Sequence, residues 1–243
     1  HFLFKFEKYN YTMKKLILKI IDFLAYLIFK LLRKPYSEYY AFCMNMIVKL
    51  NPNWGQNLER EFQLDYLKSK GLMPASVLLD YGCGALSAGR FFIDYLDEGC
   101  YVGTDVAKGV LAEGSRRLTK LGLDGKKARL IHIKNNYLPH EKIGKVDFIW
   151  AQSVVTHMSP EDLSEMISQV EPIMNKDSIF LFSFTNNESG VKHRNFKDWE
   201  YDLDTLIEIS GRYGFVCEIQ KDWTHPVDDA GTDKVVCLRL LGS

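Results

Sequence analysis

From residue 71 onward, short apolar runs alternate with segments whose apolar residues recur at helical spacing. Seven runs have the length and composition of buried strands: 76–81, 100–104, 128–133, 146–151, 178–184, 215–220 and 235–240. Four intervening segments have helical character: 89–96, 109–121, 160–174 and 203–213. The alternation predicts an α/β fold, with a doubly wound, mostly parallel seven-stranded sheet of Rossmann-like type. The short polar link ahead of the last run predicts a C-terminal antiparallel hairpin.

The first 70 residues follow a different pattern. We predict that residues 1–70 form an N-terminal helical extension or lid, ahead of one domain that spans residues 71–243. Helices are expected over 14–34, which Pro35 ends, and over 36–50 and 58–70. Because the chain begins with a histidine, we expect residues 1–12 to be upstream sequence and Met13 to be a natural start.

Residues 14–34 are more apolar than an ordinary surface helix, and basic residues flank them at both ends. Three interpretations are open: a helix packed on this domain or on a second copy as a homodimer, an interfacial membrane helix, or a transmembrane span. Asp22 stands near the centre, where an acid in a bilayer costs about 3 kcal/mol. We therefore give the transmembrane interpretation the least weight.

Composition narrows the classes of partner. Hydrophobic residues make up 47% of the chain and charged residues 26%, and the formal net charge is zero. Without a basic excess, no nucleic-acid partner is expected. The five cysteines are scattered and none has metal-ligand spacing, so we expect reduced thiols, no metal site and a cytoplasmic location, with peripheral membrane contact through residues 14–34 as an alternative.

The strongest motif is LLDYGCGALS, in which a buried strand runs into a glycine turn and then a helix. Gly82 and Gly84 let the backbone approach a ligand closely. Asp80, directly before the first glycine, favours S-adenosylmethionine over a dinucleotide and can accept from the ammonium group of that ligand. Asp105, at the end of the second strand, can accept from both ribose hydroxyls. The neighbours Cys83 and Val106 complete this set, Cys83 as a packed residue whose backbone faces the ligand.

Further candidates follow the third predicted strand. Asn135 or Asn136 can accept from the adenine amino group, and Tyr137 can cover the ring face. Trp54, in the extension, is a candidate pocket aromatic.

The segment after the fourth strand, AQSVVTHM, would lie near the sulfonium and the methyl acceptor. Gln152 and Ser153 are the candidate cofactor contacts there. His157 is the candidate catalytic residue, a general base for an acceptor hydroxyl, because imidazole titrates near neutrality. It could equally be a capping or packing residue. His225, before the last strand, is a weaker candidate.

Together, LLDYGCG, the acid of YVGTD and DFIWAQSVVTHM resemble the class I S-adenosylmethionine-dependent methyltransferase family over residues 76–240. The last stretch is similar to the SVFTH segment of many small-molecule methyltransferases. The resemblance implies a seven-stranded sheet with a C-terminal antiparallel hairpin, and S-adenosylmethionine as cofactor. Two positions depart from the family pattern: Ser87 replaces a common glycine, and an asparagine follows the third strand in place of the commoner aspartate.

The sequence therefore predicts methyl transfer to a small-molecule acceptor, an oxygen first and nitrogen or sulfur next. A sugar or lipid-linked acceptor would suit the apolar N-terminal helix. Two alternatives remain: an NAD-dependent oxidoreductase on a related fold, and a non-catalytic cofactor-binding partner subunit. Asp80 and the C-terminal hairpin argue against the first, and the intact set of Asp80, Gly82, Gly84 and Asp105 argues against loss of the cofactor site.

Overall fold

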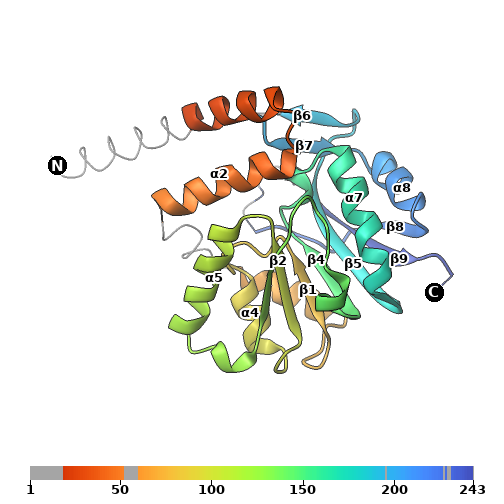
Figure 1. The fold of residues 1–243 in the computed structure, drawn as a ribbon. Helices are drawn as coiled ribbons and strands as arrows, with labels where there is room; N and C mark the ends of the chain where they lie inside the picture. The colour runs from red at the N-terminus through yellow and green to blue at the C-terminus, as the bar shows by residue number, and fades with distance from the viewer. Residues whose placement is uncertain (1–18, 52–59, 195, 227, 229–230, 243) are drawn as a thin grey trace, which may run out of the picture.

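A central sheet with helices on both faces organises the molecule (Figure 1). The computed structural model describes residues 19–51, 60–194, 196–226, 228 and 231–242. The strands are β1 (Leu78–Tyr81), β2 (Tyr101–Asp105), β3 (Arg129–His132), β4 (Val146–Ala151), β5 (Met174–Asn186), β6 (Lys192–Arg194), β7 (Asp198–Tyr201), β8 (Phe215–Gln220) and β9 (Asp233–Leu240).

Helices fill most of the connections. They are α2 (Tyr36–Leu50), α3 (Glu61–Ser69), α4 (Gly89–Tyr95), α5 (Lys108–Lys120), α6 (His140–Ile143), α7 (Pro160–Val170) and α8 (Leu203–Gly211). Short 3-10 turns are η1 (Asp124–Lys126), η2 (Val155–His157) and η3 (Glu171–Ile173). Residues 19–31, ahead of α2, are also helical and are called the N-terminal helix below.

The sheet order confirms the predicted fold class. The strands β3-β2-β1-β4-β5 lie side by side and parallel, and β9 pairs antiparallel with both β5 and β8. The chain moves from β1 outward to β3 and then returns to β4 on the other side of β1. Ligands of open α/β sheets bind at the carboxyl ends of the strands where the order reverses in this way.

A short hairpin extends the sheet beyond the seven predicted strands, so that the described residues form nine. β7 pairs parallel with the end of β5 at Thr185 and Asn186, and β6 pairs antiparallel with β7. The sequence pattern does not indicate β6 because its three residues are polar and exposed. This hairpin lies at the carboxyl end of β5, on the same edge as the glycine turn.

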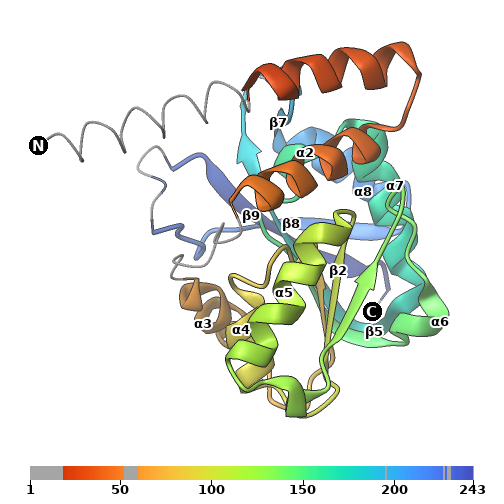
Figure 2. The ribbon, with the colours of Figure 1, turned by 60° about the vertical axis from the view of Figure 1, so that its left-hand side comes forward.

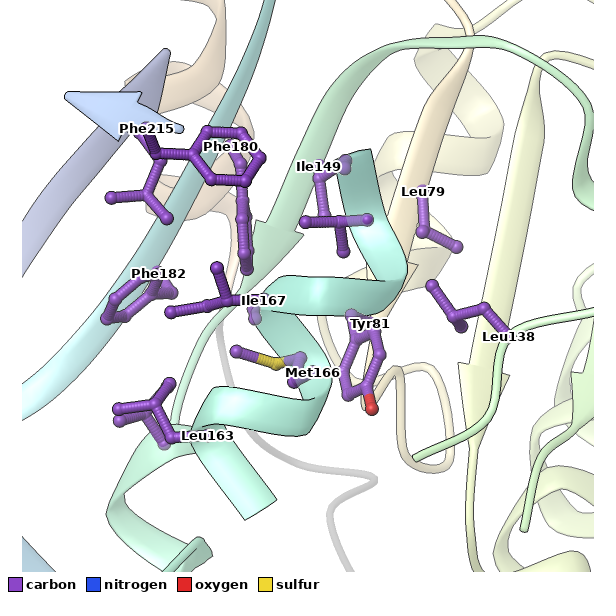
Figure 3. Packing of buried hydrophobic residues seen from close by; sticks show 14 of the residues in the cluster. Leu79, Tyr81, Leu138, Ile149, Leu163, Met166, Ile167, Phe180, Phe182 and Phe215 are labelled. Atoms are coloured by element: carbon purple, nitrogen blue, oxygen red, sulfur yellow. The ribbon is translucent and has the colours of Figure 1, made fainter. Parts of the chain in front are cut away.

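The core divides between the two faces of the sheet because successive strand side chains point to opposite sides. Leu79 and Tyr81 of β1 face the layer of α6, α7 and α8, where Met166 and Ile167 of α7 meet them (Figure 3). Leu78 faces the layer of α3, α4 and α5. The helix α7 begins with a capping box, in which Ser159 and Asp162 exchange hydrogen bonds with each other's backbone N–H groups.

The N-terminal helix packs on this chain, across α2 and beside β6 and β7 (Figures 1 and 2). Asp22, the acid in the apolar segment, accepts from the hydroxyl of Tyr39 at 2.9 Å and from the thiol of Cys43 at 3.0 Å, and pairs with Lys197 at 2.6 Å. Tyr26 packs its ring against Tyr39 and Phe196. Among the residues described, no helix is long and apolar enough to cross a membrane.

We predict that Phe180→Ala lowers the free energy of unfolding by about 3–5 kcal/mol, because its fully buried ring leaves a cavity between the sheet and the α7 layer. Guanidinium denaturation measures the loss. The control Ile207→Ala removes an exposed side chain of α8 and should change stability by less than about 0.5 kcal/mol. Equal losses in the two variants would contradict this assignment of the core.

Candidate active site

Two buried carboxylates lie at the carboxyl ends of β1 and β2. Asp80 accepts a hydrogen bond from the hydroxyl of Tyr101 at 2.6 Å. The two oxygens of Asp105 accept from backbone N–H groups, Oδ2 from Gly84 at 3.0 Å and Oδ1 from Ala107 at 2.7 Å. Asp105 thus connects the glycine turn to the end of β2. Each of its two carboxylate oxygens can accept one further hydrogen bond.

Burial governs the charge of both acids. It raises the pKa of Asp80 to about 7, against the opposing effect of the Tyr101 hydrogen bond, and the charge of Asp105 raises it further. Burial also raises the pKa of Asp105 to about 6, while the N–H groups of Ala107 and Gly84 act in the opposite direction. A cationic ligand beside these carboxylates would favour their ionised forms.

The glycine turn has left-handed backbone at both glycines, with φ of +74° at Gly82 and +58° at Gly84. A Cβ on Gly82 would lie 2.5 Å from a methyl carbon of Val154, whereas a Cβ on Gly84 would meet nothing within 4 Å. Gly84 therefore faces open space at the site. Leu86 also has positive φ, at +59°, whereas Ser87 does not, so the backbone at Ser87 does not require a glycine.

A cavity of about 350 Å³ opens over this turn. Its walls come from α2, the start of α3, the glycine turn, the segment after β4 and the β6–β7 connection. The lining residues are Tyr40, Met44, Ile47, Arg60, Gln63, Asp80, Gly82, Cys83, Gly84, Ala85, Ser87, Ala88, Asp105, Gln152, Ser153, His157 and Lys197.

A smaller cavity of about 70 Å³ adjoins it, closer to β3 and α7. Its walls are largely aromatic and aliphatic. They comprise Tyr36, Ser37, Tyr40, Tyr81, Gly82, Asp105, Val106, Ile133, Asn136, Ser153, Val154, His157, Met158 and Asp162. The two cavities share five residues, Tyr40, Gly82, Asp105, Ser153 and His157.

An amide network fixes one end of the larger cavity. The buried indole N–H of Trp150 donates to Gln63 at 2.9 Å, and Gln63 donates to Gln152 at 3.3 Å. Arg60 donates to the same Gln152 oxygen at 3.1 Å. The Gln152 Nε2 atom is buried and, among the described residues, has no hydrogen-bond partner. Such an atom is costly unless a ligand or water accepts from it.

Two neighbouring residues, Lys197 and Asp198, orient the imidazole of His157. Its Nδ1 lies 3.2 Å from the carbonyl oxygen of Lys197 and 3.2 Å from a carboxylate oxygen of Asp198. Both partners only accept, so Nδ1 carries a proton and the neutral ring has its lone pair on Nε2. Tyr40 stacks on the imidazole with the ring centroids 5.0 Å apart.

The structure brings most of the sequence-predicted residues to these two cavities. Those that line one or both are Asp80, Gly82, Cys83, Gly84, Asp105, Val106, Asn136, Gln152, Ser153 and His157. Burial raises the pKa of the Cys83 thiol well above its ordinary value, which suits a packed residue rather than a nucleophile.

Three other candidates lie outside the two cavities, and a fourth is not among the described residues. Asn135 lines neither cavity and accepts from the Ser37 hydroxyl at 3.4 Å. Tyr137 is 62% exposed and also lines neither. His225 packs against the ring of Phe62, away from both cavities. Trp54 lies outside the described residues.

The sequence predicted a helical lid and indicated Trp54 as a candidate pocket residue, but it did not identify which residues of α2 and α3 would line the site, and it missed the β6–β7 connection. Tyr36 and Tyr40 fall one helical turn apart on α2, and this spacing is the only local signal that they share a face. Arg60, Gln63 and Lys197 carry no motif and reach the site only through tertiary packing.

Residues 78–177 match the family model described as a methyltransferase domain. Over these residues the chain is similar to methyltransferase domains, and its fold is the one seen in S-adenosylmethionine-dependent methyltransferases. No curated protein matches the sequence.

Solved structures of low sequence identity share the methyltransferase fold. Magnesium protoporphyrin IX methyltransferase from Synechocystis PCC 6803, with bound S-adenosylmethionine, is 16% identical with a TM-score of 0.57, over 79% of this chain and 83% of that one. An S-adenosylmethionine-dependent methyltransferase from Clostridium acetobutylicum ATCC 824 is 13% identical with a TM-score of 0.58, over 82% and 100%. The CcbJ methyltransferase from Streptomyces caelestis is 11% identical with a TM-score of 0.63, over 80% and 96%.

We predict different effects for the same substitution at the two glycines of this methyltransferase. Gly84→Ala should cost about 1–2 kcal/mol of stability, from the left-handed backbone alone. Gly82→Ala should cost more, because the same strain is joined by the approach to Val154. Thermal unfolding of the two purified variants measures the difference. Equal stabilities would show that the turn is placed differently in solution.

Proposed function

We propose that this chain transfers a methyl group from S-adenosylmethionine to a hydroxyl oxygen of a small-molecule acceptor, with His157 as general base. The observation that carries the proposal is the position of His157. His157 lines both cavities, while Lys197 and Asp198 hold its Nδ1 proton. A base at the junction of two cavities is suited to take a proton from an acceptor that approaches the methyl donor.

The residues present fit the nucleoside part of the cofactor. The smaller cavity offers aromatic and aliphatic walls for an adenine ring, and Asn136 and Asp162 supply acceptor oxygens at its edge. Asp105, shared by both cavities, is placed to accept from ribose hydroxyls. In this assignment Asn136 serves the adenine and Asn135 does not.

The larger cavity fits the amino-acid part. Asp80 offers a carboxylate for the ammonium group, and open space beside Gly84 leaves room for the ligand. Arg60 and the unpartnered Nε2 of Gln152 are donors for the carboxylate. The charged ends of the ligand would therefore meet groups of opposite charge, and the one orphaned amide of the network would gain a partner.

The cofactor supplies an electrophilic methyl group on a sulfonium, which is a good leaving group. The chain supplies alignment and a proton acceptor. As the acceptor oxygen gains the methyl group, its proton moves to Nε2 of His157, and Asp198 stabilises the imidazolium. Tyr40 holds the ring in plane by stacking. These roles favour an oxygen acceptor, because its proton must leave as the oxygen gains the methyl group.

The alternatives from the sequence now stand differently. The match to a methyltransferase domain leaves nothing to favour an NAD-dependent oxidoreductase. A cofactor-binding partner subunit without turnover remains an outcome of the assay below. The lid role predicted within residues 1–70 is supported by α2, Arg60 and Gln63, which all line the larger cavity.

We predict that S-adenosylmethionine binds more weakly as the pH falls below about 7. With its pKa raised to about 7, Asp80 is protonated below that pH in the ligand-free protein, and the ammonium group must displace this proton. The association constant should fall roughly tenfold per pH unit below 7 and level off above 8. Isothermal titration calorimetry across the three pH units from about 5.5 to about 8.5 measures this change in the association constant.

Tyr101→Phe is the matched test of this pH dependence. It removes the hydrogen bond that lowers the Asp80 pKa, so the loss of affinity should begin at a higher pH. An affinity that does not change with pH, or an unshifted profile in this variant, would remove Asp80 from the ligand site.

We predict that His157→Ala lowers the rate of methyl transfer by roughly 10²–10⁴-fold and leaves the cofactor dissociation constant nearly unchanged. The assay follows labelled methyl groups from S-adenosylmethionine into fractionated cell extract, with mass spectrometry of the product. The same acceptor fraction is then used for the variant.

Asp198→Asn is the companion variant. It retains the size of the side chain but weakens support for the imidazolium, so its rate should fall between wild type and His157→Ala. A normal rate in a folded His157→Ala protein would leave this histidine a structural residue. Cofactor binding without transfer to any fraction would favour the partner-subunit alternative.

A further inference from the structure

The N-terminal helix has one face that binds the domain and one that does not. Asp22, Ala25, Tyr26 and Phe29 turn inward, toward α2 and the β6–β7 hairpin. The outward face consists of large apolar side chains that are 44–84% exposed: Ile20, Phe23, Leu24, Leu27, Ile28, Leu31 and Leu32. Figure 2 shows this helix at the outer boundary of the molecule, with α2 between it and the sheet.

The outward face is a continuous stripe. Residues 20, 24, 27, 28 and 31 recur at the spacing that places side chains on one side of a helix. Single exposed apolar residues are common on protein surfaces, but a contiguous set marks an interaction surface.

Contacts on the inner face hold this stripe outward. The ion pair of Asp22 with Lys197 and the hydrogen bond from Tyr39 fix the rotation of the helix about its axis. Tyr26 adds a ring contact with Phe196, and Phe23, at the edge of the outward face, also contacts that ring. Turning the stripe inward would leave Asp22 without these partners, so the exposed face belongs to the folded state.

The charges around the stripe are of one sign. Lys19 lies at one end and Lys30, Arg33 and Lys34 at the other, of which Lys34 pairs with Glu38 at 3.6 Å. The only acid between residues 19 and 34 is Asp22, which Lys197 neutralises. A second copy of the chain would bring these basic ends together whether the two helices paired parallel or antiparallel. An anionic lipid surface complements both the charges and the apolar stripe.

We propose that the outward face of the N-terminal helix docks on the surface of an anionic lipid bilayer, with the helix in the plane of the headgroups. The apolar stripe enters the boundary with the acyl chains, and the flanking basic residues contact acidic headgroups. This role is separate from methyl transfer, and it would place α2 and the two cavities beneath it next to the membrane.

Vesicle flotation with the full chain tests the docking. Two kinds of vesicle are compared, phosphatidylcholine alone and phosphatidylcholine mixed with phosphatidylglycerol. We expect the protein to float with the mixed vesicles, with at least about tenfold stronger binding than to the neutral ones and with weaker binding at high salt.

The double variant Leu24→Glu, Ile28→Glu should lose this binding, because it puts charge on the exposed stripe without touching the inner contacts. Its thermal unfolding and its affinity for S-adenosylmethionine should match wild type, which separates this result from failure of the proposed function. The matched control is Leu121→Glu, another exposed apolar position, at the end of α5, and it should float like wild type.

Two results would overturn the proposal. The first is a failure of the flotation test, either because wild-type protein stays unbound with both kinds of vesicle or because the double variant floats as well as wild type. The other is a dimer in light scattering that the double variant abolishes while no flotation occurs, which would assign the face to a second copy.

Discussion

The site depends on one carboxylate withdrawn from water. Asp105 ends β2, and its two oxygens are held by the backbone N–H groups of Gly84 and Ala107. Burial of an acid is unfavourable unless donors replace its hydration, and here the donors come from the turn and the strand end that must meet at the ligand. The carboxylate proposed to bind a ribose therefore also ties the glycine turn after β1 to the end of β2.

A half-buried acid, Asp22, organises the N-terminal helix. Asp22 would be unfavourable in so apolar a helix without Lys197, Tyr39 and Cys43 around it. Lys197 in turn offers its carbonyl oxygen to His157. The orientation of the candidate base is thus linked to a residue near the start of the chain, through one side chain and one backbone group.

The sequence was sufficient where the signals are local. The strand before the glycine turn, the turn itself and the terminal hairpin follow from short-range periodicity and from backbone angles that favour glycine. The sequence was insufficient where tertiary packing determines which residues line the site. Asn135 and Asn136 both have positive φ, and only the second lines one of the two cavities of the site, which neighbouring residue types do not reveal.

The same limit applies to β6 and to the wall residues. Lys192, His193 and Arg194 form a strand because Asp198, Trp199 and Glu200 offer them a partner, and their own pattern is that of a loop. Gln63 is held at the site by the indole of Trp150 and Arg60 by the side chain of Gln152, and both contacts join segments far apart in the chain.

The placement of α2 has a consequence for turnover. Residues of this one helix line both cavities, with Tyr36 and Ser37 over the smaller, Met44 and Ile47 over the larger, and Tyr40 between them. Any displacement of α2 uncovers the two spaces together. Because the proposed function places the two ends of the cofactor in these two spaces, one movement of α2 would open the whole cofactor site at once.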